Sequence, residues 1–240
     1  MKLLNSFYAV ILMLLSIRVF SIKKNFKNKR IAIVGAADSV FDEKNGDFID
    51  SFDIVIRINK AALLWDKEKS DYLGSKFTYL YHSFYENSYS GGGPINFGEF
   101  EDLGVQKIIH PNSDFKGLRT HLNFYKRHLK LKKTYVFPPV LYKKITKDLV
   151  GFQPTVGFSA IYSVLNSDFK ELYLTGFTFF KSPYVPGYRD EFRDKKANEE
   201  HIKKQGIHHP DKEFEVFKML LQRSKNRRII LDSRLQKLIE

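Results

Sequence analysis

Cysteine is absent from the 240-residue sequence. Disulfide bonds and thiolate-bound metal sites are therefore excluded. Such a chain suits a reducing compartment, although the absence alone does not establish one. With 43% hydrophobic and 15% aromatic residues, the composition otherwise fits a folded globular domain with a full core.

The chain also lacks two common nucleotide-binding signatures. The glycine turn that begins at Gly35 reads G-A-A-D-S, so it does not match G-x-G-x-x-G, and the sequence has no Walker lysine. A dinucleotide site of the usual kind and a P-loop are therefore excluded. Any nucleotide must be bound by other groups.

Acidic residues are too few to balance the basic ones, and the formal net charge is +13. An excess of this size favours anionic partners, which include nucleic acids, anionic lipids and phosphorylated or acidic sugars. The sequence contains no nucleic-acid-binding motif, so we expect no nucleic acid partner.

Long apolar runs are absent except near the N-terminus. Leu3–Ile17 is almost wholly apolar, but it is shorter than the roughly 20 residues of a membrane span. We predict a hydrophobic anchor or interfacial helix over residues 1–28 and a single domain over residues 29–240. A cleaved signal is disfavoured because no small-x-small site precedes Lys23. A helix docked on the domain is the remaining alternative.

Basic residues follow this apolar run at Arg18, Lys23, Lys24, Lys27, Lys29 and Arg30. By the positive-inside rule they favour the cytoplasmic side of a membrane for the main domain. We therefore expect a membrane-associated protein with a membrane surface among its partners.

The clearest fold signal is a pair of short apolar runs. Ile31–Val34 is rich in branched residues, as buried strands are, and Phe52–Asn59 is a second run of this kind. Small residues follow the first run, whereas Arg57 and Asn59 end the second. Ligands of open α/β sheets bind at such carboxyl ends. An ordinary βαβ unit without a ligand is the alternative.

Strand and helix patterns continue to alternate along the chain. We predict strands at residues 76–81, 105–110, 134–137, 170–174 and 228–231, and helices at 61–69, 116–130, 157–165, 214–221 and 235–239. The alternation predicts an α/β fold with a single Rossmann-like, mostly parallel sheet flanked by helices. The glycine-rich stretch Tyr85–Gly98 is predicted to be a mobile lid or a linker.

Pro154–Phe180 predicts a helix start beside a strand end. Thr155 can cap a helix that begins near Gly157, and Gly176 closes the strand that follows. Helix N-termini bind phosphate through their free N–H groups. A generic αβ pair is the alternative.

Three segments, taken in order, resemble the motifs of sialyltransferases. The large donor-binding motif I-D-x-x-D-x-V-x-R-x-N is matched over Ile49–Asn59. The small motif, P-[ST]-x-G followed by a strand ending L-x-G-[FI], is matched from Pro154 to Phe177. His208 and Glu213 then stand as H-x-x-x-x-E. The resemblance covers about Ile31–Leu221 and implies the GT-A-like variant of the α/β fold that this family adopts.

Two positions depart from that resemblance. Ala36 stands where the family has an asparagine after the glycine, and Phe180 stands where the bacterial lipooligosaccharide sialyltransferases have a phosphate-binding tyrosine. Tyr184 and Tyr188 are the remaining candidates for that role. The chain also lacks the disulfide that joins the two large motifs of animal sialyltransferases.

The resemblance implies inverting transfer of sialic acid from a CMP-activated donor to a glycan or glycolipid hydroxyl. His208 is the predicted general base, because histidine titrates near neutral pH. The groups predicted to meet the leaving phosphate are Tyr184, Tyr188, Arg189 and the helix start at Thr155 and Gly157. The groups predicted to bind the nucleotide are Gly35, Ser39, Asn59 and Gly176. Glu213 is predicted to be at most a helix-cap acid.

No cofactor and no metal are expected. The sequence lacks D-x-D, with which many other glycosyltransferases hold a metal–nucleotide complex. Ala36 and Phe180 leave two alternatives open. The donor could be another CMP-activated acidic sugar such as Kdo, or the chain could be a membrane-associated module that binds a nucleotide without transferring a sugar.

Overall fold

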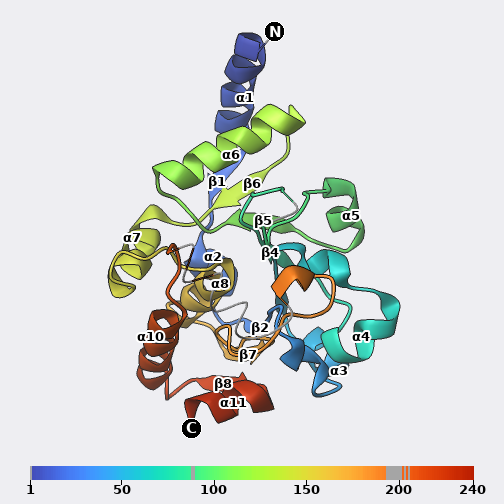
Figure 1. The fold of residues 1–240 in the computed structure, drawn as a ribbon, viewed down its shortest axis with the longest axis vertical. Coiled ribbons are helices and arrows are strands. Elements are labelled where there is room, and N and C mark those ends of the chain that lie inside the picture. The colour runs from blue at the N-terminus through green and yellow to red at the C-terminus, as the bar shows by residue number, and fades with distance from the viewer. Residues whose placement is uncertain (1, 88–89, 193–201, 203, 205) are drawn as a thin grey trace.

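Eight strands form one sheet in a computed structural model of the chain, which describes residues 2–87, 90–192, 202, 204 and 206–240 (Figure 1). Their order across the sheet is β1-β6-β5-β4-β3-β2-β7-β8, and every neighbouring pair is parallel. The predicted α/β fold with a Rossmann-like sheet is confirmed. The strands are β1 (Ile17–Val19), β2 (Arg30–Val34), β3 (Ile54–Ile58), β4 (Tyr79–Tyr81), β5 (Lys107–His110), β6 (Thr134–Val136), β7 (Glu171–Thr175) and β8 (Arg228–Leu231).

Helices cover both faces of this sheet. The α-helices are α1 (Lys2–Ser16), α2 (Ile22–Phe26), α3 (Gly46–Asp50), α4 (Ser70–Leu73), α5 (Phe97–Asp102), α6 (Phe115–His128), α7 (Pro139–Asp148), α8 (Val156–Leu165), α10 (Pro210–Arg223) and α11 (Ser233–Ile239). Short 3₁₀ turns are η1 (Asp38–Phe41), η2 (Asn59–Leu64), η3 (Lys67–Lys69) and η4 (Asp190–Phe192). The prediction of a helix over residues 61–69 is wrong, because Trp65 has an extended backbone that separates η2 from η3.

Alternate residues of each central strand face opposite layers. Ile31 and Ile33 pack with α7, α8 and α10, whereas Ala32 and Val34 pack with the segment around η1, α3 and α4. Beyond them, the far side of β4 and β5 packs against α1, α5 and α6. Because both faces are covered, the strands are apolar at nearly every position, as the continuous apolar runs in the sequence indicate.

Part of the N-terminal segment 1–28 belongs to the sheet domain. β1 pairs with β6 at the sheet edge, and the fully buried rings of Phe20 and Phe26 pack against Tyr79. α1 lies against α6, and its residues Ala9 and Leu12 are buried there. In the described part of the chain, no helix is both long enough and apolar enough to cross a membrane.

Candidate active site

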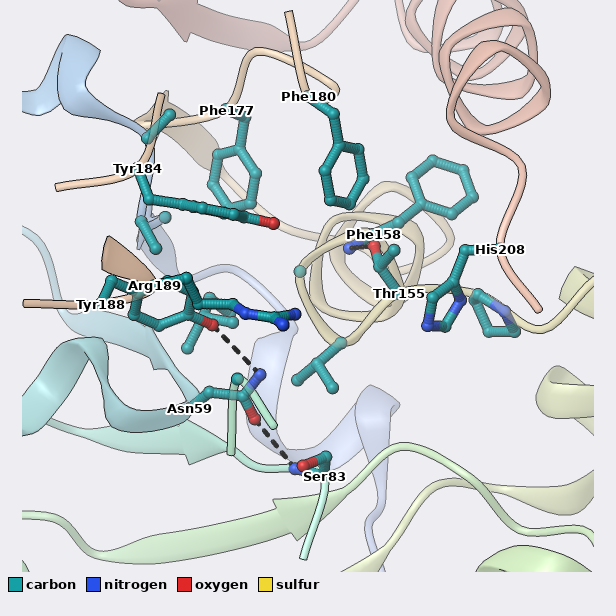
Figure 2. A pocket seen from close by; sticks show the side chains of 18 of the residues that line it. Asn59, Ser83, Thr155, Phe158, Phe177, Phe180, Tyr184, Tyr188, Arg189 and His208 are labelled. Carbon is teal, nitrogen blue, oxygen red and sulfur yellow. Dashed lines mark hydrogen bonds between the residues drawn. The ribbon is translucent and has the colours of Figure 1, made fainter. Parts of the chain in front are cut away.

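A cavity of about 510 Å³ opens at the carboxyl ends of β2, β3, β4 and β7 (Figure 2). Its walls come from the turn after β2, the loop after β4, the start of α8, the segment after β7 and the residues that lead into α10. A parallel sheet brings all these strand ends to one edge, so segments far apart in the sequence meet there.

Two glycines at the base of the cavity are required by close packing of the backbone. A Cβ atom on Gly35 would lie 2.2 Å from the carbonyl oxygen of Gly176. Gly176 has a positive φ of 75°, and a Cβ atom there would lie 2.5 Å from the side chain of Val40. The two turns can therefore approach one another only where side chains are absent.

The large motif divides into residues that hold the fold and one that reaches the cavity. The carboxylate of Asp50 accepts hydrogen bonds from the backbone N–H groups of Ser75 and Lys76, and Asp53 accepts one from the backbone of Arg30. Arg57 is buried, and its guanidinium donates to the carbonyls of Leu73, Gly74 and Lys76. Burial lowers the pKa of Arg57 to about 10. Asp50 and Arg57 therefore hold the segment before β4 in place, and Asp53 holds the start of β2.

Asn59 is the motif residue that lines the cavity. Its Oδ1 accepts a hydrogen bond from the backbone of Ser83 at 2.9 Å, and its Nδ2 donates to the hydroxyl of Tyr188 at 3.4 Å. The amide thereby joins the end of β3 to the loop after β4 and to the segment after β7. Burial raises the pKa of Tyr188, so this hydroxyl keeps its proton.

The start of α8 is held by a buried carboxyl group from α10. Thr155 caps α8 by accepting a hydrogen bond from the backbone of Phe158 at 3.1 Å. Glu213 accepts from the backbone N–H of Thr155 at 2.6 Å and from its hydroxyl at 2.9 Å. Burial raises the pKa of Glu213 to about 8, against the effect of the two donors from Thr155. Glu213 therefore acts on the cap of another helix.

His208 lies on the same side of the cavity as this helix start (Figure 2). Its Nδ1 lies 2.7 Å from the carbonyl oxygen of Gln153. A carbonyl only accepts, so Nδ1 carries the ring hydrogen and Nε2 is the basic nitrogen of the neutral ring. Burial lowers the pKa of His208, against the effect of the Gln153 carbonyl, and so favours this neutral form.

Aromatic and cationic side chains form the opposite wall. The rings of Tyr184 and Tyr188 lie 4.9 Å apart, and Arg189 forms an ion pair with Glu191 at 2.9 Å. In Figure 2 the side chains of Tyr184 and Arg189 extend into the cavity toward α8. Phe180 also lines the cavity, with its ring 6.2 Å from that of Tyr184.

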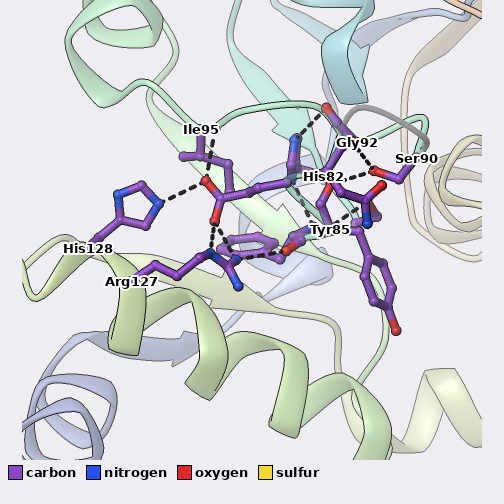
Figure 3. A network of polar contacts seen from close by, with 11 residues as sticks. His82, Tyr85, Ser90, Gly92, Ile95, Arg127 and His128 are labelled. Carbon is purple, nitrogen blue, oxygen red and sulfur yellow. Dashed lines mark hydrogen bonds and ion pairs between the residues drawn. The ribbon is translucent and has the colours of Figure 1, made fainter. Parts of the chain in front are cut away.

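The loop after β4 completes the wall, and a polar network holds it (Figure 3). His82 donates from Nε2 to the carbonyl of Gly92 at 2.8 Å and accepts at Nδ1 from the backbone of Phe84 at 2.9 Å. Burial lowers the pKa of His82 to about 4, so the ring stays neutral. Glu86 pairs with Arg127 and with His128 of α6. Tyr85, Asn87 and residues 90–92 of the stretch predicted to be a lid or linker thus line the cavity.

The structure brings together nine of the ten predicted site residues, and they line one cavity: Gly35, Asn59, Thr155, Gly157, Gly176, Tyr184, Tyr188, Arg189 and His208. Ser39 is the exception among the described residues, since it is buried within η1 and lies outside the lining. Ala37 occupies the N-cap position of η1, which leaves Ser39 inside the turn.

Sequence reasoning missed several polar groups of the wall, namely Asn87, Ser90, Asn112 and Gln153. Ser83 and Asn112 follow the carboxyl ends of β4 and β5, so the rule that singled out Asn59 also applies to them. Within the part of the chain that the structure describes, no group of three or more His, Cys, Asp or Glu side chains could hold a metal ion.

Solved structures of sialyltransferases have a similar fold. A mammalian sialyltransferase is 19% identical, with a TM-score of 0.59 over 93% of this chain and 77% of that chain. The structure of a mammalian sialyltransferase with Gal-beta-1-3GalNAc-ortho-nitrophenol gives 17% identity and a TM-score of 0.57, with the same coverage. CstII from Campylobacter jejuni with CMP-3FNeuAc gives 15% identity and a TM-score of 0.52, over 85% of this chain and 81% of that chain.

A search of curated proteins finds no match to this sequence. The family is established by the sequence. Residues 2–225 match the model of Glycosyltransferase family 29 (sialyltransferase). This range takes in all three motifs and every strand except β8. The chain therefore belongs to glycosyltransferase family 29, the sialyltransferase family.

Proposed function

We propose that the protein transfers sialic acid from a CMP-activated donor to a hydroxyl of a glycan or glycolipid, with inversion at the anomeric carbon. The observation that carries this proposal is the position of His208. Its Nδ1 is bound to Gln153, so its basic Nε2 is available in the same cavity as Tyr184 and Arg189. The base and the start of α8 lie on one side of the cavity and the hydroxyl and cationic groups on the other, so a donor bound between them can contact both sides.

In the proposed reaction, the acceptor oxygen attacks the anomeric carbon while the bond from that carbon to the phosphate oxygen breaks. The acceptor hydroxyl gives its proton to Nε2 of His208, and CMP leaves with the electron pair of the broken bond. Burial keeps His208 neutral before the attack, which is the form that a general base needs.

The leaving CMP phosphate gains negative charge, and three kinds of group are placed to stabilise it. These are the hydroxyls of Tyr184 and Tyr188, the guanidinium of Arg189, and the backbone N–H groups of Val156 and Gly157 at the start of α8. Donors that are already oriented stabilise a developing charge more effectively than water does. The contact of Glu213 with Thr155 fixes the direction of α8 toward this charge.

No cofactor and no metal ion take part in the proposed mechanism. The proposal rests on the missing D-x-D sequence and on the protein groups just named, which can meet the phosphate themselves. The donor is a substrate that carries its own activation as a CMP ester.

The test is to incubate the full chain with CMP-sialic acid and follow release of CMP, with and without candidate glycan acceptors. Acceptor-dependent release, with the sugar recovered on the acceptor in inverted configuration, is the expected result. Retained configuration at the anomeric carbon would contradict the mechanism.

Ala36 and Phe180 support a second candidate within the same chemistry, because both line the cavity at positions where the resemblance implies polar groups. In that case the donor is another CMP-activated acidic sugar such as Kdo. CMP-Kdo in the same assay distinguishes the two. Nucleotide binding without release of CMP from either donor would instead identify an inactive binding module.

A further inference from the structure

The outer side of α1 is a continuous apolar surface. Leu4, Phe7 and Leu14 are 75%, 69% and 71% exposed, and Leu15 beside them is 59% exposed. The opposite side of the helix is buried against α6 through Ala9 and Leu12. A helix that is apolar on both sides, with only one side covered, has a second surface for which the fold supplies no partner among the described residues.

Exposed apolar side chains gather in this part of the molecule. Of the fifteen large apolar side chains that are exposed in the described part of the chain, eleven lie in residues 1–29 and 115–137. Besides those on α1, they include Val19 on β1, Phe115 and Leu118 on α6, and Leu131 in the segment before β6. Since β1 pairs with β6 and α1 packs on α6, the two stretches are neighbours in space (Figure 1).

The same two stretches carry the whole charge excess of the protein. Residues 1–29 and 115–137 contain thirteen Lys and Arg residues and no Asp or Glu, whereas the rest of the chain contains 27 of each sign. Among the residues that the structure describes, two of the thirteen pair with carboxylates from elsewhere, Arg127 with Glu86 and Lys132 with Glu101. We call the helices and strands of these two stretches, which are α1, β1, α2, α6 and β6, the basic lobe.

Lys107, which lies next to the basic lobe, is affected by the positive charges of the lobe. Burial lowers the pKa of Lys107 at the start of β5, and the charges of Lys24 and Lys133 lower it further. Lys24 belongs to α2 and Lys133 lies just before β6, so cations from both stretches act at one place. The two stretches are far apart in the sequence, but in the folded protein they lie close enough to act on the same lysine.

We propose that the basic lobe docks on the surface of an anionic lipid bilayer, with the outer side of α1 inserted among the lipids. A bilayer offers hydrocarbon to Leu4, Phe7 and Leu14 and anionic headgroups to the surrounding cations. Nucleic acid offers the charge without the hydrocarbon. A second copy of the chain offers an apolar surface, but it brings two lobes of the same sign together.

The dimensions of α1 define how it meets the membrane. A helix of fifteen residues is about 22 Å long, shorter than a hydrocarbon core of about 30 Å. Its contact with α6 also ties it to the domain, so it lies in the interface instead of crossing the bilayer. The cytoplasmic leaflet is the favoured side, because anionic lipids are concentrated there.

The experiment is flotation of the full chain with large unilamellar vesicles of phosphatidylcholine alone, or with one quarter phosphatidylglycerol. We expect binding to the anionic vesicles that weakens with added salt. Phe7→Ser with Leu14→Ser should lower the partition coefficient by about 100-fold, through loss of two inserted side chains. The matched control is Val150→Ser, which removes an apolar side chain that is 71% exposed outside the basic lobe.

Charge reversals test the other half of the proposal. Lys116→Glu with Arg119→Glu, on the exposed side of α6, should weaken binding to anionic vesicles by about 30-fold or more. Lys225→Glu, at an exposed position outside the basic lobe, should have little effect. Near-UV circular dichroism of each variant confirms that the fold is retained.

Three outcomes would overturn the proposal. The first is vesicle binding that is unchanged in the Phe7 and Leu14 double variant. The second is equal binding to neutral and anionic vesicles at all salt concentrations. The third is no vesicle binding together with a concentration-dependent dimer that the double variant abolishes, which would identify a second copy of the chain as the partner of α1.

Discussion

Nδ1 of His208 donates a hydrogen bond to the carbonyl oxygen of Gln153 at 2.7 Å. Gln153 precedes the cap of α8, and Glu213 on α10 holds that cap through Thr155. The candidate base and the helix start that would meet the donor phosphate are thus fixed to one another. Movement of α10 relative to α8 would displace both.

The first prediction concerns the base itself. His208→Ala should lower the turnover number by about 10²- to 10⁴-fold while binding of the CMP donor survives, because the change removes a proton acceptor and no donor contact. Turnover is measured by CMP release, and donor binding by calorimetry with CMP. Activity within a few-fold of wild type would remove His208 from the mechanism.

His209→Ala is the matched control for that variant. His209 caps α10 by accepting from the backbone of Lys212, so its loss should cost about 1 kcal/mol of stability. Turnover should remain near wild type. A loss of turnover in His209→Ala alone would move the catalytic role to that neighbour.

The second prediction is the direction of the pH dependence. A general base works only when neutral, so kcat/KM should fall as the pH drops through the pKa of His208. Burial lowers that pKa, so the midpoint of the acid limb should lie below the ordinary value of 6.5. The pH profile of kcat/KM, which reports groups of the free enzyme, measures it, and a midpoint above 6.5 would contradict the assigned environment.

The sequence was sufficient for the fold wherever a strand is buried on both faces. Ile31–Val34 is apolar at every position because layers of helices cover both sides of β2. β1 was not predicted, since Ile17–Val19 continues the apolar run of α1 and its three residues become a strand only by pairing with β6. That pairing depends on residues more than a hundred positions away, which local patterns do not contain.

For the site, the sequence indicated the strand ends and helix starts but not the contacts between them. Asn59 was predicted from its place at the end of a strand. The spacing of His208 and Glu213 on the chain does not reveal that Glu213 holds Thr155. Ser39 was predicted to bind the nucleotide, yet it lies inside η1, whose N-cap is Ala37, and is buried there.

The third prediction separates the two tyrosines. Tyr184→Phe should lower the turnover number by about 10²-fold, because one preoriented donor to the leaving phosphate is lost. Tyr188→Phe removes the partner of Asn59 as well, so donor affinity should also fall. Tyr72→Phe, outside the cavity lining, is the control. Steady-state kinetics measures both the turnover number and the Michaelis constant for the donor. Full turnover in both cavity variants would exclude stabilisation of the leaving CMP by these hydroxyls.

The fourth prediction is activity without a divalent cation. After treatment with EDTA and gel filtration, transfer should continue at an unchanged rate, because the proposed stabilising groups belong to the protein. Addition of Mg²⁺ or Mn²⁺ should restore nothing. A rate that vanishes with EDTA and returns with either ion would contradict the metal-free mechanism.

The last prediction separates structure from binding within one motif. Arg57 is buried and donates to the carbonyls of Leu73, Gly74 and Lys76, so Arg57→Met should leave these acceptors unpaired. We expect a loss of about 2–5 kcal/mol in the free energy of unfolding, measured with urea. At low temperature, where the variant remains folded, its Michaelis constant for the donor should be within a few-fold of wild type.

Asn59→Asp should have the opposite effect. The carboxylate still accepts from the backbone of Ser83 and tolerates the positive φ of 51° at this position, so the variant should still fold. The donor N–H group to Tyr188 is lost, and a negative charge appears where an anionic donor is expected. The Michaelis constant for the CMP donor should therefore rise at least tenfold. If Arg57→Met weakened donor binding while remaining as stable as wild type, the division of roles within Ile49–Asn59 would be wrong.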